Sequence, residues 1–316
     1  MDDAGGPVFA LTLHRSGGTV LARMLNCHPG LVIWGEHAGF INQLAALDDS
    51  IGRFDAIASP PPAPRLRKFA QSKTRDEGKF EPWIHPFDRA EFRRWCGDFI
   101  EQTFARHLAP GQRWGFKEIR YHSMALARFL VTLFPNCRLV ILRRDLTELC
   151  VSNLLALWTM KALKQAGVAD NETLADQAIA DCAYALTTVD AGLAEIAETF
   201  PDRTISLSYR RLSQSPFEEI ERVFEFLGLE TDSEVRKALD AAWNVKSGAT
   251  DKSKGAGALT RETIERLAPR YLAAARAEIA AGGQDLARLR RLCGRGRFSF
   301  VAGDHALRDT PYSSMF

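Results

Sequence analysis

The chain has 316 residues, 46% of them hydrophobic, and can bury a large core. Its 41 basic and 39 acidic residues leave a formal net charge of only +2, which excludes a global field that would recruit nucleic acid or an anionic membrane surface. Any anion-binding site must therefore be local.

The cysteines are scattered and form no CxxC pair, which argues against a structural zinc site and against a disulfide framework. They are Cys27, Cys96, Cys137, Cys150, Cys182 and Cys293. The apolar run at residues 8–13 is too short for a signal peptide, and a membrane span needs about 20 residues. We therefore expect a cytoplasmic protein in a reducing compartment, without a membrane anchor.

The first part of the chain predicts a strand, a tight loop, a helix and a second strand. Residues 7–13 read PVFALTL, the loop HRSGG follows, and apolar residues recur at helical spacing over 19–28. After the helix breaker HPG, residues 31–34 read LVIW. Two strands joined by a crossover helix predict a parallel sheet, and helices cover parallel sheets on both faces. We expect an α/β fold, a P-loop-like three-layer sandwich.

The rest of the chain extends this pattern. Residues 48–90 contain the proline run SPPPAP and many charges, and we expect an irregular insertion there, within one domain that spans residues 1–316. The further elements predicted are helices at 90–108, 124–134, 146–158 and 216–229, and strands at 113–120, 137–145 and 205–212. Ligands of such folds bind at the carboxyl ends of the strands.

The loop after the first strand has the features of an anion site. Gly17 and Gly18 stand where the strand gives way to the helix, so backbone N–H groups can approach an anion closely. An ATP or GTP site would need the pattern GxxxxGK[ST], yet here Arg15 precedes the glycines and no lysine follows them. Taken alone, the loop also fits an ordinary strand-to-helix turn with a surface arginine.

The stretch HRSGGTVLARMLNCHPGLVIWGEH, residues 14–37, resembles the 5′-phosphosulfate-binding region of sulfotransferases that use 3′-phosphoadenosine 5′-phosphosulfate (PAPS). It is most similar to the branch with tyrosylprotein sulfotransferases and bacterial carbohydrate and metabolite sulfotransferases. The resemblance implies that the loop binds the donor through Arg15, Ser16, Gly17, Gly18, Thr19 and Val20. Gly18 departs from the usual serine or threonine and lacks its hydroxyl contact.

A second motif of the same family binds the 3′-phosphate with an arginine at a strand end and a serine eight positions later. Arg144 and Ser152 in LVILRRDLTELCVSN have this spacing, although Leu146 replaces the usual proline. Alternatively, Arg143 and Arg144 form a solvated basic pair. A strand that ends in arginines, without a magnesium-binding acid, speaks against a kinase or an ATPase.

The resemblance implies three further positions near the nucleotide. Tyr209 matches a family tyrosine at the end of a late strand, although a half-buried core tyrosine would look the same. Lys252 and Lys254 lie where family members often fold a basic loop over the 3′-phosphate, and they match no strict motif.

The resemblance also implies the catalytic residues. Glu36, in the GE pair after the second strand, would be the general base, with His37 as the alternative base. Arg15 and Lys117 would neutralise the charge that develops during transfer. The alternatives are an ion pair between Glu36 and Arg15 and a surface position for Lys117.

The sequence thus predicts a sulfotransferase that moves a sulfuryl group from PAPS to a hydroxyl, or less readily an amine, without a metal ion. We expect a small-molecule, carbohydrate or peptide acceptor, and the helix with Trp158 is one candidate for lining its pocket. An atypical P-loop small-molecule kinase and a non-catalytic binding protein on the same fold stay as alternatives.

Overall fold

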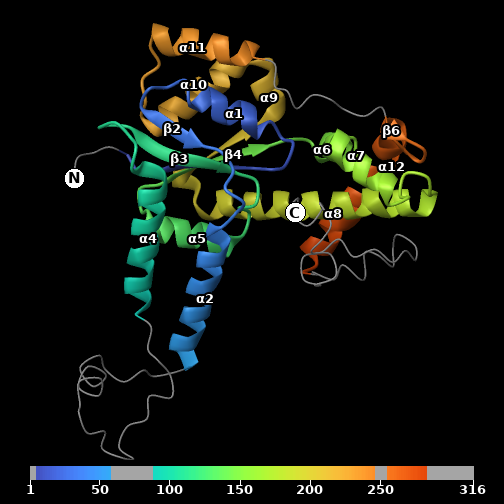
Figure 1. Cartoon of the computed structure of the whole chain (residues 1–316), viewed down its shortest axis with the longest axis horizontal. Coiled ribbons are helices and arrows are strands. Elements are labelled where there is room, and N and C mark those ends of the chain that lie inside the picture. The colour runs from blue at the N-terminus through green and yellow to red at the C-terminus, as the bar shows by residue number, and fades with distance from the viewer. Residues whose placement is uncertain (1–4, 58–87, 246–254, 283–316) are drawn as a thin grey trace, which may run out of the picture.

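The computed structural model describes residues 5–57, 88–245 and 255–282. Its centre is a five-stranded parallel sheet in the order β2-β3-β1-β4-β5 (Figure 1). The strands are β1 (Val8–Thr12), β2 (Leu31–Trp34), β3 (Arg113–Glu118), β4 (Arg138–Arg143) and β5 (Thr204–Ser208). The predicted α/β sandwich with a central parallel sheet is confirmed.

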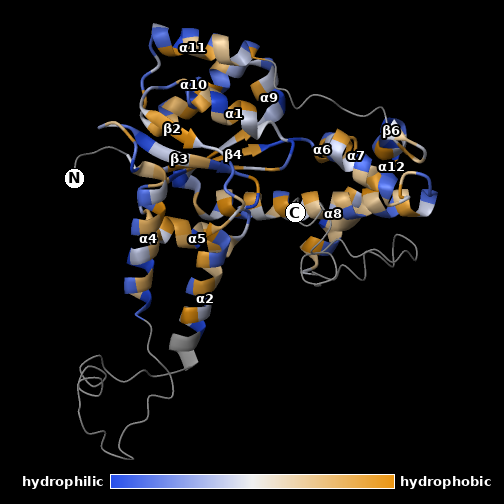
Figure 2. Ribbon diagram, in the orientation of Figure 1, coloured by the Kyte–Doolittle hydropathy of each residue, from blue (hydrophilic) through white to orange (hydrophobic). Residues whose placement is uncertain are grey.

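Successive side chains of a strand point to opposite faces, so each face of this sheet forms a hydrophobic core of its own. Phe9 and Leu11 of β1 enter one core, whereas Val8 and Ala10 enter the other. Helices cover both faces, with apolar residues turned inward (Figure 2). On one face lie α1 (Gly18–Leu25), α9 (Tyr209–Gln214), α10 (Pro216–Leu227) and α11 (Ser233–Asn244). On the other lie α2 (Ile41–Ile57), α4 (Arg89–Ala105), α5 (Met124–Leu133) and α8 (Glu172–Thr199).

The remaining described elements extend the second layer beyond the sheet. Helix α12 (Arg261–Ala280) packs on α8 and on α6 (Leu146–Leu154). Helix α7 (Leu157–Gln165) contacts the short hairpin of β6 (Gly255–Ala256) and β7 (Leu259–Thr260), and a 3-10 turn (Pro201–Arg203) precedes β5.

Strand β3 lies between β1 and β2, although helix α1 connects those two strands directly. The outer edge of β2 is held from α1 by Asn26, whose side-chain amide accepts from the Ile33 N–H at 2.7 Å and donates to the Ile33 carbonyl at 2.9 Å. Because β3 lies between β1 and β2, its end is next to the ends of both strands, and this determines the neighbours of Lys117.

Three boundaries differ from the sequence-based predictions. Helix α2 runs to Ile57 and α4 begins at Arg89, so both ends of the segment 48–90 are helical; residues 58–87 lie outside the described part, as do Lys252 and Lys254. The strand predicted at 205–212 ends at Ser208, and Tyr209 begins α9. The helix predicted at 146–158 is two helices, because the chain turns at Leu155 and Ala156.

Ion pairs join the two helical ends of the insertion. Asp48 of α2 is buried and accepts bidentate hydrogen bonds from Arg89 and Arg93 of α4, at distances between 2.7 and 3.1 Å. A buried acid and its two arginines break the apolar periodicity that the sequence-based prediction used.

The five described cysteines are free thiols. Among the described helices, none is both long and apolar enough to cross a membrane.

Gly115 is required by the close approach of β3 to β1. A Cβ at this position would lie 1.9 Å from the Val8 carbonyl oxygen and 2.8 Å from Ile33 Cδ1. We expect Gly115→Ala to lower the free energy of unfolding by about 3 kcal/mol, because the strands must separate to admit the methyl group. Chemical denaturation measures the change.

The control is Gly97→Ala in α4, where a Cβ would meet nothing within 4 Å. It should raise the free energy of unfolding by up to about 1 kcal/mol, because alanine is the better helix former. Equal effects at the two positions would contradict the steric explanation.

Candidate active site

The loop between β1 and α1 is held rigidly at the carboxyl end of the sheet. Ser16 is fully buried, and its hydroxyl donates to the Leu13 carbonyl at 2.7 Å. Arg15 has φ 64° and Gly17 has φ 99°, so both residues are in the left-handed region, which is uncommon for arginine. Helix α1 begins immediately afterwards at Gly18, so its N-terminus opens onto the loop. This is the geometry of an anion-binding turn.

Both glycines of the loop are needed for space. A Cβ on Gly17 would lie 2.6 Å from two ring atoms of Tyr209. A Cβ on Gly18 would lie 2.6 Å from Thr12 Oγ1 and 2.7 Å from Lys117 Cε. The place that a serine or threonine side chain would take at Gly18 is therefore taken by Thr12 and Lys117, which gives a physical reason for the departure from the sulfotransferase pattern.

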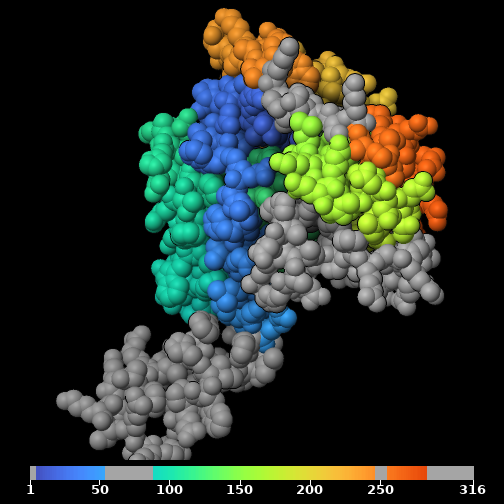
Figure 3. Space-filling view, turned by 45° about the vertical axis from the view of Figure 1, so that its right-hand side comes forward, coloured from blue at the N-terminus to red at the C-terminus, as the bar shows by residue number. Residues whose placement is uncertain are grey.

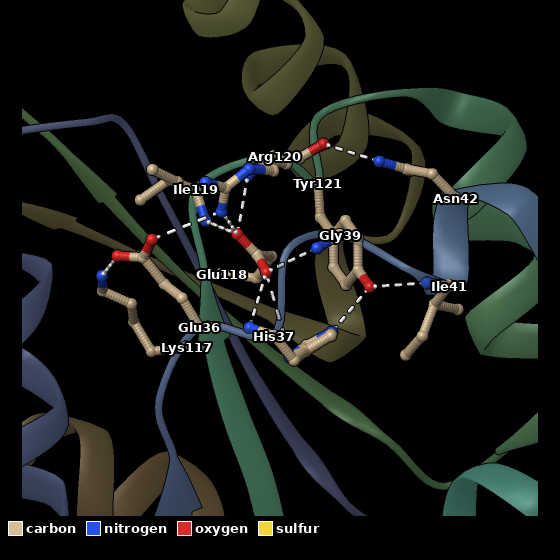
Figure 4. Close-up of polar contacts among 10 residues, drawn as sticks. All are labelled: Glu36, His37, Gly39, Ile41, Asn42, Lys117, Glu118, Ile119, Arg120 and Tyr121. Atoms are coloured by element: carbon tan, nitrogen blue, oxygen red, sulfur yellow. Dashed lines mark hydrogen bonds and ion pairs between the residues drawn. The ribbon is translucent and has the colours of Figure 1, made fainter. Parts of the chain in front are cut away.

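Lys117 connects the loop with Glu36. Its side chain is buried, and its ammonium group forms an ion pair with Glu36 Oε1 (Figure 4). The second oxygen of Glu36 accepts from Arg120 Nη1 at 3.3 Å. The interpretation of Lys117 as a surface lysine is wrong, and Glu36 lies between two cations at the ends of β2 and β3.

The next residue, Glu118, is a completely buried carboxylate. It accepts hydrogen bonds from the backbone N–H groups of His37, Gly39, Ile119 and Arg120, and from the Arg120 guanidinium. Burial alone would raise the pKa of Glu118, but these hydrogen bonds and the Arg120 charge hold it below its ordinary value. Glu118 is therefore an anion that fixes the loop after β2.

His37 points away from Lys117 into an aromatic pocket. Its ring lies in edge contact with Phe40, Phe104, Phe116 and Tyr121. Its Nε2 is 2.6 Å from the Tyr121 hydroxyl, which accepts from the Ile41 N–H at 3.0 Å and so can donate its own proton to the imidazole. Burial lowers the pKa of His37, which favours the neutral ring. His37 is thus held in the core by Tyr121.

A second cationic cluster lies on the other side of the loop, at the start of α6. The Arg144 guanidinium stacks over the Tyr209 ring, 4.2 Å from its centroid, and Nη1 donates to the Arg15 carbonyl at 3.2 Å. Burial and the Arg144 charge lower the pKa of Arg15. Ser152, two turns along α6, is buried.

The two arginines that end β4 have different environments. Arg143 donates two hydrogen bonds to the carboxylate of Asp190 on α8, at 2.7 and 2.6 Å, and this pairing raises the pKa of Arg143. Arg144 turns toward the β1–α1 loop instead and forms an ion pair with Glu148, its Nη2 lying 2.9 Å from Oε2. Asp145 pairs with neither, because its carboxylate caps α6 by accepting from the Glu148 N–H. The interpretation of the two arginines as a solvated pair therefore fails for Arg144, whose side chain is 16% exposed, whereas Arg143 is 43% exposed.

His14 precedes Arg15 and is fixed by α6. Its Nδ1 lies 2.5 Å from Asn153 Oδ1, and the Asn153 amide nitrogen donates to the Leu149 carbonyl, so the oxygen accepts the proton on Nδ1. Burial lowers the pKa of His14. Trp158, 43% exposed at the start of α7, lies edge-on to the His14 ring with centroids 5.7 Å apart.

The structure brings most of the sequence-predicted site residues together around the β1–α1 loop. Four residues of the network had not been predicted, namely Glu118, Arg120, Tyr121 and Asn153. Glu118 and Arg120 stand beside Lys117 in the segment WGFKEIR, so their position was the available signal. In the described part of the chain, no group of three or more His, Cys, Asp or Glu side chains is arranged to hold a metal ion.

Comparison with known protein families decides the classification. A family model described as the sulfotransferase family matches residues 7–233. The chain belongs to the sulfotransferase family. The matched region includes all five strands of the sheet, together with the loop, Glu36, Lys117, Arg144 and Tyr209.

Solved sulfotransferase structures are similar to this chain only at low sequence identity. The sulfotransferase domain of the Synechococcus PCC 7002 olefin synthase is 17% identical, with 85% of this chain and 96% of that chain covered and a TM-score of 0.44. A sulfotransferase from Alicyclobacillus acidocaldarius is 16% identical, with 90% and 99% covered and a TM-score of 0.44. Mouse sulfotransferase SULT7A1, solved with PAP, is 12% identical, with 91% and 88% covered and a TM-score of 0.43. No curated protein sequence gives a significant match.

Three partly buried histidines and the buried Glu118 predict that this sulfotransferase loses stability in acid. The pKa values of His14, His37 and His122 are held below the ordinary 6.5, and that of Glu118 below 4.5. On acidification the unfolded chain therefore binds protons before the folded chain does, so stability falls as the pH drops below 6.5 and again below 4.5. Thermal unfolding between about pH 7.5 and pH 4 measures this.

The variant His37→Phe removes one of the groups. Its melting temperature should depend less steeply on pH below 6.5 than that of the wild type, whatever its stability at neutral pH. A wild-type melting temperature that stays constant from neutral pH to about pH 5 would contradict this explanation.

Proposed function

We propose that this sulfotransferase transfers a sulfuryl group from PAPS to a hydroxyl group of an acceptor, with Glu36 as general base. The observation that carries the proposal is the position of Lys117. Its chain passes beside Gly18 at the N-terminus of α1, and its ammonium group contacts Glu36. A cation that lies between an anion-binding loop and a carboxylate has the position needed for transfer from a bound anion to an acceptor activated by that carboxylate.

The loop residues fit the 5′-phosphosulfate end of the donor. Gly17 and Gly18 stand at the start of α1, where the helix dipole favours an anion. Thr19 and Val20 would complete this turn with their N–H groups, which are among the first of the helix. Arg15 and Lys117 supply positive charge on the two sides.

Arg144, Ser152 and Tyr209 are proposed to hold the 3′-phosphoadenosine end. The Arg144 guanidinium lies over the Tyr209 ring and close to the backbone of Arg15, and its Nε and Nη2 are each 2.9 Å from Glu148 Oε2. A phosphate would take the place of the Glu148 carboxylate on these two nitrogens, which can bind it bidentately. Burial, and after it the Arg144 charge, lower the pKa of Arg15, and a bound anion would offset both effects.

The proposed reaction is an in-line displacement. The Glu36 carboxylate accepts the proton of the acceptor hydroxyl, whose oxygen forms the new bond to sulfur while the bond from sulfur to the phosphate oxygen breaks. Lys117 and Arg15 neutralise the charge that the leaving phosphate gains. PAP and the sulfated acceptor are the products, and Glu36 returns its proton to solvent. His37 is not proposed as the base, because its Nε2 is held by Tyr121 in the aromatic pocket.

The acceptor is proposed to enter beside helix α7. In Figure 3 the surface is hollowed between the blue N-terminal segment and the yellow-green segment that includes α6 and α7. The exposed ring of Trp158, at the start of α7, lies against His14, the residue before Arg15. Small molecules, carbohydrates and peptides all present hydroxyl groups that fit this proposal, and we propose that the whole chain acts as one cytoplasmic enzyme.

Binding of PAP, the expected product, tests the donor site. We expect micromolar affinity by calorimetry in buffer without metal ions, and a loss of about 50-fold in Arg144→Ala, because one bidentate phosphate contact disappears. ATP should compete poorly. The matched control is Arg143→Ala, which removes the ion pair with Asp190 and should leave the affinity for PAP unchanged.

Tight binding of ATP that requires magnesium, together with no binding of PAP, would overturn the proposal. The chain would then be better explained as an atypical P-loop kinase. Retained PAP affinity in Arg144→Ala would contradict only the assignment of the 3′-phosphate contact.

Glu36→Gln tests the base. We expect turnover of PAPS to fall by about 100-fold or more, because the amide cannot accept the acceptor proton, while the affinity for PAP stays within about threefold of the wild type. Radiolabelled PAPS with a panel of phenol, sugar and peptide acceptors supplies the measurement. Unchanged turnover in Glu36→Gln would remove Glu36 from the mechanism.

A further inference from the structure

Glu118 has no role in the proposed reaction, yet it is a fully buried carboxylate next to Lys117. Burying a charge is costly unless hydrogen bonds and counter-charges compensate it. Here four backbone N–H groups and one guanidinium converge on the two oxygens. Such a concentration of donors indicates that the carboxylate organises the surrounding backbone.

One oxygen of Glu118 holds the loop that follows Glu36. Oε2 accepts from the N–H of His37 at 3.1 Å and from the N–H of Gly39 at 3.0 Å (Figure 4). Ala38 and Gly39 have φ values of 57° and 68°, so this loop turns through the left-handed region. Backbone N–H groups that converge in such a turn form a concave anion site, which the Glu118 carboxylate fills.

The other oxygen of Glu118 reaches Glu36 through Arg120. Oε1 accepts from Arg120 Nη1 at 2.8 Å, and the same nitrogen donates to Glu36 Oε2 at 3.3 Å. Arg120 is therefore a bridge between a buried carboxylate and the proposed base. The side chain of Arg120 is 25% exposed, so it lies at the boundary between the core and the site.

We infer that Glu118 is a positioning residue that sets the orientation of the Glu36 carboxylate, an inference that rests on the proposed function. Consecutive residues of a strand point to opposite faces, so Lys117 and Glu118 approach Glu36 from two sides. Lys117 holds Oε1 directly, and Glu118 holds Oε2 through Arg120.

The test compares Glu118→Gln with a matched control. Glutamine has nearly the same shape, but its NH₂ group replaces one of the two carboxylate oxygens. This group would face backbone N–H donors in either orientation, so the loop or Arg120 must shift. The control is Asp48→Asn, which alters another buried carboxylate held by two arginines, on α2 and α4. The measurements are the melting temperature, calorimetric PAP affinity, and release of sulfate from radiolabelled PAPS to water.

For Glu118→Gln we expect turnover at saturating PAPS to fall at least about tenfold, with PAP affinity within about twofold of the wild type. Asp48→Asn should lower the melting temperature without lowering turnover. Unchanged turnover in Glu118→Gln would overturn the inference, and so would a parallel loss of turnover and PAP affinity, which would indicate general distortion. If Glu118→Gln does not fold, Arg120→Gln tests the same bridge and should show the same selective loss.

Failure of the proposed function gives a different result. A wild type that does not bind PAP overturns that function, whatever the variants do. If the wild type binds PAP but releases no sulfate to water, crystal structures of the wild type and Glu118→Gln decide the positioning role. An unchanged Glu36 carboxylate and unchanged backbone at residues 35–39 would overturn it.

Discussion

The site is organised around one ion pair between neighbouring parallel strands. A buried ammonium group requires an anion within reach, and Lys117 has the Glu36 carboxylate. This contact is possible because β3 is inserted between β1 and β2. Its last residues therefore lie beside the loop that follows β1 and the turn that follows β2. A side chain at Gly18 would meet both Thr12 and the Lys117 chain, which occupy that space.

The same geometry separates two kinds of charge. On the side of α1 and α6, the cations Arg15 and Arg144 converge and suit an anionic ligand. On the side of β2, carboxylates and cations alternate from Lys117 through Glu36 and Arg120 to Glu118. A chain of alternating charges is nearly neutral overall, so it fixes positions, and Lys117 at its end lies beside Gly18 of the loop. The small net charge of the protein is thus compatible with a local pair of cations, Arg15 and Arg144, beside the loop.

The sequence was sufficient to predict the five strands. Its local patterns also drew attention to the glycine loop, to Glu36 and to the spacing of Arg144 and Ser152, whose roles stay proposals. It could not predict the order of the strands, since nothing local indicates that β3 separates β1 from β2. Glu118 was missed for a related reason. Its partners at His37 and Gly39 are 81 and 79 residues away, and a glutamate at a strand end normally lies in solvent.

Asn26 has a consequence beyond the placement of β2. An edge strand exposes unpaired peptide groups, and these can recruit a strand from another molecule. At Ile33 both outward peptide groups are already bonded to the Asn26 side chain, which acts as a short surrogate strand. Asn26 therefore protects the sheet against edge-to-edge aggregation at β2, the strand that leads to Glu36. The first consequence of its loss would be poor solubility of the protein at high concentration.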